Sequence, residues 1–344
     1  MVKPALYSFF RLFVLGFVFL FTYPLKGYVQ TVQEPIIVSY VTANTKPLPD
    51  VSLITHINYA FGLVNEAFDG VDVSNEERLK EVVKLKIKSP NLKVLLSIGG
   101  WGAGRFSEMA ADDSFRTSFA KDCKRIVDEF ALDGVDIDWE YPSSAEAGIS
   151  AGVDDVANFT LLMRDIRKEI GNAKLLTLAT IADAKYVNFV DINPYIDFVN
   201  VMMYDVSKPS LHHSALRRSV LSGRVTAEEA VEAHLKAGVP LNKLVLGVPF
   251  YGRGDKKQTS DYVLFRDIDK FSNFEERWDD IAKVPYLVDS KGELVLTFEN
   301  VKSIGIKGEY IRKRGLLGGM YWEFFADNDK LDLSKALYNS LYRK

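Results

Sequence analysis

The sequence is poor in cysteine: Cys123 is the single one among 344 residues, so no intramolecular disulfide can form. Around Cys123, Phe115, Phe119, Ile126 and Phe130 recur at helical spacing, which predicts a buried position on a helix. The sequence also lacks basic runs interleaved with aromatic residues, and its formal charge is −3. These two properties argue against a nucleic-acid partner.

Long hydrophobic runs are also missing, since none reaches the roughly 20 residues that a membrane-spanning helix needs. The nearest approach is the apolar run at 12–21, which follows Lys3 and Arg11 and ends in a break. This order is typical of secretory signals, so residues 1–27 are predicted to be a signal peptide on a secreted or periplasmic protein. Because the sequence at the expected cleavage site is a poor match to the usual small-residue pattern, an uncleaved N-terminal membrane anchor is the alternative.

Eight short apolar runs alternate with amphipathic stretches along the rest of the chain. Most are too continuously apolar for a one-sided strand, as expected of parallel strands covered on both faces. Eight such strands with helical crossovers predict an α/β fold, a (β/α)8 barrel. An open doubly wound sheet is the rival, but no glycine-rich phosphate turn follows the first run. The runs begin at Ile36, His56, Lys93, Gly134, Leu175, Asp197, Leu244 and Gly315.

Capping signals mark some of the intervening helices. Ser74 with Glu77, and Thr226 with Glu229, have the spacing of a capping box at a helix start. The stretch 154–171 repeats apolar residues at helical spacing and predicts another helix.

The longest gap between runs is the one before the last, and residues at about 255–300 fill it. The segment "VPYLVDSKGELVLTFEN" there reads as a hairpin with its turn at 290–292. We therefore predict one catalytic barrel over 28–344 that carries a small insertion, rather than a second domain.

The stretch "DGVDIDWEYP", residues 133–142, places acids on an otherwise apolar strand. Side chains of a strand alternate between two faces, so Asp136, Asp138 and Glu140 share one face, about 6.5–7 Å apart. Because like charges raise one another's pKa, one group can hold a proton near neutral pH and act as a general acid. Glu140 is nearest the carboxyl end of the strand, where barrel enzymes place their active sites.

Several chemistries fit this run. Paired carboxylates suggest glycoside hydrolysis, but ordinary glycosidases place the two acids on either side of the scissile bond. No opposite acid is evident, so an N-acetyl group of the substrate could supply the nucleophile. The run could instead bind Mg²⁺ or Ca²⁺, or form a structural hydrogen-bond network. In either case Asp136 needs polar partners, and Ser97 and Tyr40 on neighbouring runs are candidates.

The motif "DGVDIDWEYP" resembles the D-G-x-D-x-D-x-E signature of glycoside hydrolase family 18, the chitinases. The resemblance extends over about 36–325, because "SIGGW", "MMYD", "PFYGR" and "GGMYWE" follow in family order. It implies a (β/α)8 barrel, in agreement with the run count, and an enzyme without cofactor or metal.

Carried over to this sequence, the resemblance implies that Glu140 is the catalytic acid and that Asp138 orients the substrate acetamido group. Asp136 would exchange a shared proton beneath Asp138, and Tyr204 would hydrogen-bond the acetamido oxygen. Ser97 would support Asp136. Expected substrate-binding residues are Trp322 as an apolar floor, and Met202, Asp205, Tyr40, Phe61, Trp101, Tyr251 and Arg253. The adjacent His212 and His213 are expected in a loop near the cleft, and Asp327 and Asp329 in solvent.

The implied function is a monomeric chitinase-type hydrolase that cleaves β-1,4 bonds between N-acetylglucosamine units with retention. Its partner would be chitin, a chitooligosaccharide or another glycan that contains N-acetylglucosamine. The reduced insertion and the lack of a carbohydrate-binding module favour soluble or amorphous chains over crystalline chitin. The alternatives are an endo-β-N-acetylglucosaminidase acting on N-glycan cores and a glycan-binding protein without hydrolytic activity.

Overall fold

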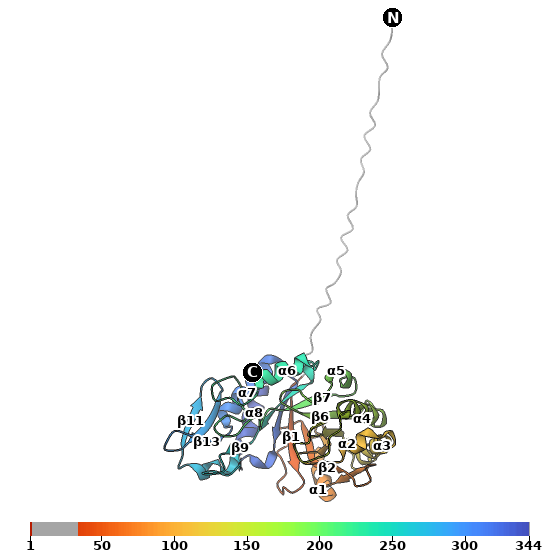
Figure 1. Ribbon diagram of the computed structural model, residues 1–344, viewed down its shortest axis with the longest axis horizontal. Helices are drawn as coiled ribbons and strands as arrows, with labels where there is room; N and C mark the ends of the chain where they lie inside the picture. The colour runs from red at the N-terminus through yellow and green to blue at the C-terminus, as the bar shows by residue number, and fades with distance from the viewer. Residues whose placement is uncertain (2–33, 344) are drawn as a thin grey trace. The chain divides into compact units, whose positions relative to one another are not determined.

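Eight parallel strands close into a barrel within residues 34–343, which with Met1 are the residues that this computed structural model describes (Figure 1). Neighbouring strands pair in parallel around the ring, and the first strand pairs with both the second and the last. The predicted (β/α)8 barrel and all eight runs are therefore confirmed. The strands are β1 Ile36–Thr42, β2 His56–Val64, β4 Lys93–Gly99, β5 Gly134–Asp138, β6 Leu175–Ile181, β7 Phe198–Met202, β8 Leu244–Pro249 and β14 Gly318–Trp322.

The predicted signal peptide lies almost wholly outside the described residues. Among the residues that are described, no helix combines the length and the apolar character that crossing a membrane requires.

Helices lie outside the barrel (Figure 1). The helix α3 carries the predicted apolar stripe, in which Phe119, Cys123 and Ile126 are buried, and burial raises the pKa of the Cys123 thiol. The α-helices are α1 Glu76–Val83, α2 Phe106–Ala111, α3 Asp113–Glu129, α4 Asp155–Ile170, α5 Phe189–Ile192, α6 Ala227–Lys236, α7 Val301–Arg314 and α8 Asp332–Tyr342. Short 3₁₀ helices are η1 Lys84–Ile87, η2 Leu241–Lys243, η3 Phe265–Phe271 and η4 Phe324–Ala326.

One of the two predicted capping boxes is confirmed. The Thr226 side chain accepts from the backbone N–H of Glu229 and the Glu229 side chain accepts from that of Thr226, at the start of α6. The box at Ser74 is wrong, because α1 begins one residue later and Asn75 caps it by accepting from the N–H of Arg78.

The apolar residues of the barrel strands fall into two clusters, one on each side of the barrel wall. The outer cluster packs the strands against the helices, and Val135 and Ile137 of β5 belong to it. The inner cluster fills the barrel and includes Val38, Ala179 and Val245. Burying such side chains stabilises the fold by about 1.5–3 kcal/mol each.

A second, antiparallel sheet lies between β8 and α7, set apart from the barrel strands (Figure 1). Its last two strands form the predicted hairpin, with the turn between them. The sheet is larger than that hairpin because three more strands join it, and the first of them begins directly after β8. Its strands are β9 Tyr251–Gly254, β10 Tyr262–Leu264, β11 Glu275–Asp279, β12 Val284–Val288 and β13 Leu294–Thr297. A short strand, β3 Val71–Val73, pairs antiparallel with β2.

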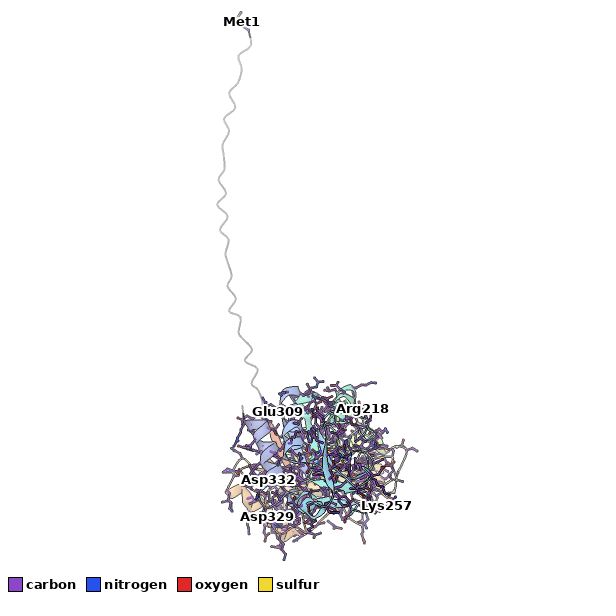
Figure 2. The ribbon with its side chains drawn as sticks, turned by 90° about the vertical axis from the view of Figure 1, so that its left-hand side faces the viewer. Met1, Arg218, Lys257, Glu309, Asp329 and Asp332 are labelled. Carbon is purple, nitrogen blue, oxygen red and sulfur yellow. The ribbon has the colours of Figure 1, made fainter. Side chains whose placement is uncertain are left out.

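The two acids after β14 have different environments. Asp329 is exposed at the surface as expected (Figure 2), and it forms an ion pair with Arg266. Asp327 was wrongly expected in solvent: it is 2% exposed and accepts hydrogen bonds from Ser334 and from the N–H of Leu333. The carboxylate thus satisfies otherwise unpaired donors at the start of α8.

A fully buried ion pair joins the inserted sheet to the barrel. Lys307 of α7 pairs with Glu299, which follows β13, and both side chains are at most 1% exposed. The Lys307 ammonium also donates to the backbone oxygen of Ser214 and to its Oγ at 2.9 Å. Ser214 in turn donates to the carbonyl oxygen of Met203, directly after β7.

Replacing Lys307 by Met should lower the free energy of unfolding by about 3–5 kcal/mol, because it leaves Glu299 as an uncompensated buried charge. Lys313→Met on the same helix is the control. It breaks an exposed pair with Glu309 and should cost less than about 1 kcal/mol. Urea denaturation of both variants measures the difference, and equal losses would contradict the assignment.

Candidate active site

The acidic run lies on β5 and the residue pair that follows it. Asp136 and Asp138 face the barrel interior and are 0% and 4% exposed. Trp139 points the other way, against Phe106 of α2 with a centroid distance of 5.3 Å. The alternation predicted for this strand therefore holds, and Glu140 follows at its carboxyl end.

The Asp136 carboxylate accepts four hydrogen bonds. Tyr40 Oη donates to its Oδ2 at 2.7 Å and Ser97 Oγ to the same atom at 2.9 Å, as expected for these two residues. Thr177 Oγ1 donates to Oδ1 at 2.5 Å and Asn200 Nδ2 at 3.2 Å. Burial raises the pKa of Asp136 and the four donors oppose that rise. Four donors on two oxygens fit an ionised carboxylate.

The pKa values of Asp138 and Glu140 are both raised. Burial raises the pKa of Asp138 well above its usual range, and the charges of Glu140 and Asp136 raise it further. Burial also raises the pKa of Glu140, to about 7, against a hydrogen bond from Tyr141. The Oδ1 atom of Asp138 is buried without a hydrogen-bond partner. The pair therefore shares protons near neutral pH, as coupled carboxyl groups do.

The two glycines of "SIGGW" bring neighbouring backbone close to these acids. A Cβ atom at Gly99 would lie 2.0 Å from the carbonyl oxygen of Asp138, and one at Gly100 would lie 2.8 Å from the Phe61 ring. Both glycines have positive φ, 125° and 98°. A larger residue at either position would displace Asp138 or Phe61.

An aromatic floor lies beside the acids. The Trp322 ring is 5.6 Å from that of Phe61, nearly parallel at 19°, and 5.5 Å from that of Tyr40. Burial raises the pKa of Tyr204, and the charges of Asp138 and Glu140 raise it further, so its hydroxyl remains a hydrogen-bond donor.

Asp205 is held ionised by basic neighbours. Arg253 donates to it with two nitrogens, Nε at 2.6 Å and Nη2, and the buried His213 has its Nδ1 3.6 Å away. Burial would raise the pKa of Asp205, but these contacts outweigh it and lower that pKa below its usual range. The two histidines lie in the β7–α6 loop as expected, and His213 is near the cleft, but the side chains of both are fully buried. His212 Nε2 instead contacts Asp279 of β11 at 3.1 Å.

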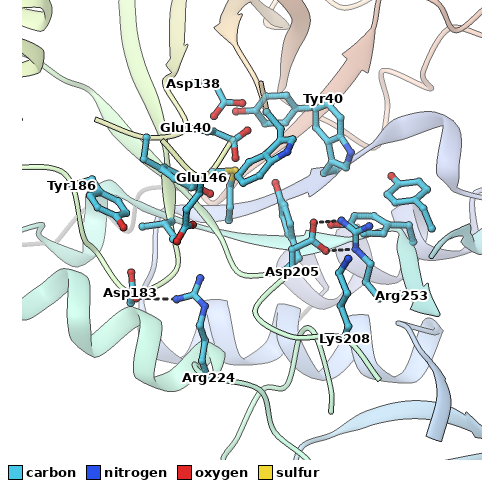
Figure 3. A pocket seen from close by; sticks show the side chains of 18 of the residues that line it. Tyr40, Asp138, Glu140, Glu146, Asp183, Tyr186, Asp205, Lys208, Arg224 and Arg253 are labelled. Carbon is cyan, nitrogen blue, oxygen red and sulfur yellow. Dashed lines mark hydrogen bonds and ion pairs between the residues drawn. The ribbon is translucent and has the colours of Figure 1, made fainter. Parts of the chain in front are cut away.

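These groups line one cavity of about 820 Å³, in the upper part of the range of roughly 300–1,000 Å³ usual for ligand sites (Figure 3). The predicted residues that line it are Tyr40, Phe61, Trp101, Asp138, Glu140, Met202, Tyr204, Asp205, Tyr251, Arg253 and Trp322. Asp136 and Ser97 are not in its lining and are fully buried. Lining residues that sequence reasoning missed are Tyr141, Glu146, Ile181, Asp183, Lys185, Tyr186, Lys208, Arg224, Asp261 and Tyr262.

The missed residues flank the acids on two sides. Asp183 and Tyr186 lie on one side of Glu140, and Lys208 lies on the other, with the predicted Asp205 and Arg253 (Figure 3). The Tyr186 ring stacks on Tyr141 at 5.6 Å. Tyr141 is within the quoted motif and Tyr262 stacks on the predicted Tyr251, but the other missed residues belong to no recognisable pattern.

The arrangement suits acid–base chemistry on a ligand bound in the cavity. Glu140, with its pKa of about 7, can give and take a proton at the cavity surface. Asp138 beside it can hydrogen-bond or carry charge in a low-dielectric setting. Within residues 34–343, no three His, Cys, Asp or Glu side chains are grouped so that they could hold a metal ion.

The chain is similar to several known chitinases and related enzymes. Chitinase A1 of Niallia circulans is 33% identical over 300 residues, which cover 73% of this chain and 43% of that protein. Chitinase B of Serratia marcescens is 27% identical, with 94% and 83% covered. The solved structure of a glycoside hydrolase family 18 N-acetylglucosaminidase from Paenibacillus barengoltzii matches with a TM-score of 0.81 and 35% identity, covering 89% of this chain and all of that one.

The chain spans less than half the length of chitinase A1. The sequence profile of the glycosyl hydrolases family 18 matches residues 36–327, which include all eight barrel strands and the inserted sheet. The protein is therefore a glycosidase of the glycosyl hydrolases family 18.

Proposed function

We propose that this glycosidase is a chitinase-type enzyme, which cleaves β-1,4 bonds between N-acetylglucosamine units with retention and with help from the substrate's own acetamido group. The observation that carries the proposal is the placement of Asp138 and Glu140 side by side on one face. Ordinary glycosidases place their two catalytic acids on opposite sides of the scissile bond, whereas here the two acids are neighbours.

Glu140 is the general acid of the proposed reaction. Its proton goes to the glycosidic oxygen as the bond to the anomeric carbon breaks. In the second half of the reaction the ionised Glu140 takes a proton from the attacking water, so the group returns to its starting form.

Asp138 and Tyr204 act on the acetamido group. The acetamido carbonyl oxygen attacks the anomeric carbon and forms a cyclic oxazolinium-like intermediate. We take the pair of Asp138 and Glu140 to hold one proton, which lies on Glu140 when the reaction starts, so that Asp138 is ionised and its charge stabilises the positive nitrogen of the intermediate. The Tyr204 hydroxyl orients the oxygen by hydrogen bonding. Asp136 remains the ionised support beneath Asp138, and does not exchange a proton with it as the resemblance implied, because its oxygens already accept four hydrogen bonds.

Trp322 is the floor under the reacting sugar, and Phe61 and Tyr40 hold it in place through the ring contacts described above. The leaving-group sugars then lie beyond Glu140, along the leaving-group wall, the side of the cavity formed by Trp101, Tyr141 and Tyr186.

We also propose that the enzyme acts outside the cytoplasm as a monomer on soluble or amorphous glycans. The N-terminal sequence and the similarity to chitinases support this proposal.

Glu140→Gln should lower kcat on chitotetraose by about 10³-fold or more, because no other group can protonate the leaving oxygen. Binding of chitotetraose, followed by calorimetry, should persist. Turnover at the wild-type rate in this variant would refute the role of Glu140. Cleavage of a high-mannose glycoprotein but not of chitotetraose by the wild-type protein would instead identify an endo-β-N-acetylglucosaminidase.

The pH profile of kcat/KM should fall as pH rises through about 7, because Glu140 loses its proton there. Asp205→Asn removes a negative charge that raises the pKa of Glu140, so the fall should move to lower pH. Glu323→Gln is the control: burial also raises the pKa of Glu323 to about 7, but this residue has no part in the proposed reaction. If the fall of kcat/KM disappears in the Glu323 variant, the fall comes from Glu323 and not from Glu140.

Cellotetraose, which carries hydroxyl groups where chitotetraose carries acetamido groups, should not be cleaved at a detectable rate. Without the amide no nucleophile is available on the substrate. Product analysis by mass spectrometry compares the two, and comparable cleavage of both would rule out catalysis assisted by the substrate.

A further inference from the structure

The leaving-group wall is built from loops that follow neighbouring strands. The loop after β4 carries Trp101, the loop between β5 and α4 carries Tyr141, and the loop after β6 carries Tyr186. The centroids of the Trp101 and Tyr141 rings are 6.4 Å apart, and Trp101 is 62% exposed. Because so much of the Trp101 side chain is exposed, packing against its neighbours is not sufficient to hold the leaving-group wall in place.

A single buried carboxylate, that of Asp155, connects the first two of these loops. Asp155 is the first residue of α4 and is 1% exposed. Its Oδ2 atom accepts from the N–H of Ser143 at 3.0 Å and from that of Gly152 at 2.7 Å, near the two ends of the β5–α4 loop. Its Oδ1 atom accepts from Ser107 Oγ at 2.7 Å, in α2 directly after the β4 loop.

Other contacts close the same loop. Ser143 Oγ donates to the carbonyl oxygen of Gly152 at 2.8 Å, and Ser150 Oγ donates to Glu108 of α2 at 2.8 Å. A Cβ atom at Gly152 would lie 2.8 Å from Asp155 Oδ1, so the close approach requires glycine unless the carboxylate shifts.

The hydrogen bonds of Asp155 do not cap α4. All three donors lie outside that helix, in the β5–α4 loop and in α2. The residue at the cap position is Asp154, whose side chain makes no capping hydrogen bond. The buried carboxylate therefore acts on the loops, and Ser143, one of its donors, follows Glu140 by only three residues.

We propose that Asp155 is a positioning residue that fixes the leaving-group wall and thereby sets how tightly the enzyme binds the sugars beyond the scissile bond. This inference rests on the proposed function. Asp155 affects how tightly the leaving-group sugars are bound, and it has no effect on the chemistry of the acetamido sugar.

The test compares two substrates. Chitopentaose places sugars on both sides of the scissile bond, whereas chitobiose oxazoline, the cyclic form of the proposed intermediate, has no leaving-group sugar. Asp155→Ala should lower kcat/KM for chitopentaose by about tenfold, mostly through a higher KM, because hydrogen bonds to a charged acceptor are lost. Hydrolysis of the oxazoline should change less than about twofold.

Three further variants complete the design. Asp154→Asn is the matched control, because Asp154 is the adjacent exposed acid and its side chain makes no capping hydrogen bond. This variant should behave as wild type on both substrates. Asp155→Asn keeps the shape and one acceptor oxygen and should recover part of the loss. Ser107→Ala removes a single hydrogen bond and should lower kcat/KM for chitopentaose about twofold to threefold, which tests the idea even if Asp155→Ala does not fold.

Equal losses on the two substrates would show that Asp155 supports the fold as a whole, and an unchanged KM for chitopentaose would overturn the inference directly. Failure of the proposed function has a separate signature. The wild-type protein would then cleave neither substrate, which is visible before any variant is compared.

Discussion

The burial of Asp136 at the centre of the barrel is the constraint on which the site depends. An ionised carboxylate in an apolar interior is costly unless each oxygen is hydrogen-bonded. The donors come from four strands, β1, β4, β6 and β7, so the carboxylate is fixed only when these strands are in register. Its charge then raises the pKa of Asp138, which links the packing of the barrel to the protonation of the acids above it.

Much of this centre could be predicted from the sequence, because strand geometry is local. Alternation along one strand is sufficient to align the acids, and Tyr40 and Ser97 were candidate partners of Asp136 on neighbouring runs. Thr177 and Asn200 could not be found in this way. Thr177 stands opposite Asp136 in the pairing of β5 with β6, a register that the sequence does not show, and Asn200 reaches Asp136 from β7, one strand further around the ring.

One error arose where burial depends on how the chain folds around a residue. Asp327 has the local sequence of a solvated loop residue, but it is buried by α8, which follows it. The contact of His213 with Asp205 was not predicted either, because it depends on a fold of the β7–α6 loop that no local pattern marks. The inserted sheet was underestimated because its first strand, β9, follows β8 almost without a break and continues the same apolar pattern.

The barrel closes through the pairing of β1 with β14, which are nearly 300 residues apart in the sequence. Tyr40, one donor to Asp136, comes from the first of these strands, and Trp322, the aromatic floor, comes from the last. During synthesis, a chain that has not yet emerged as far as Trp322 can have neither a closed barrel nor a floor in its cleft. The cleft is therefore assembled at the end of translation, and until then the nascent chain has no complete surface with which to bind a glycan.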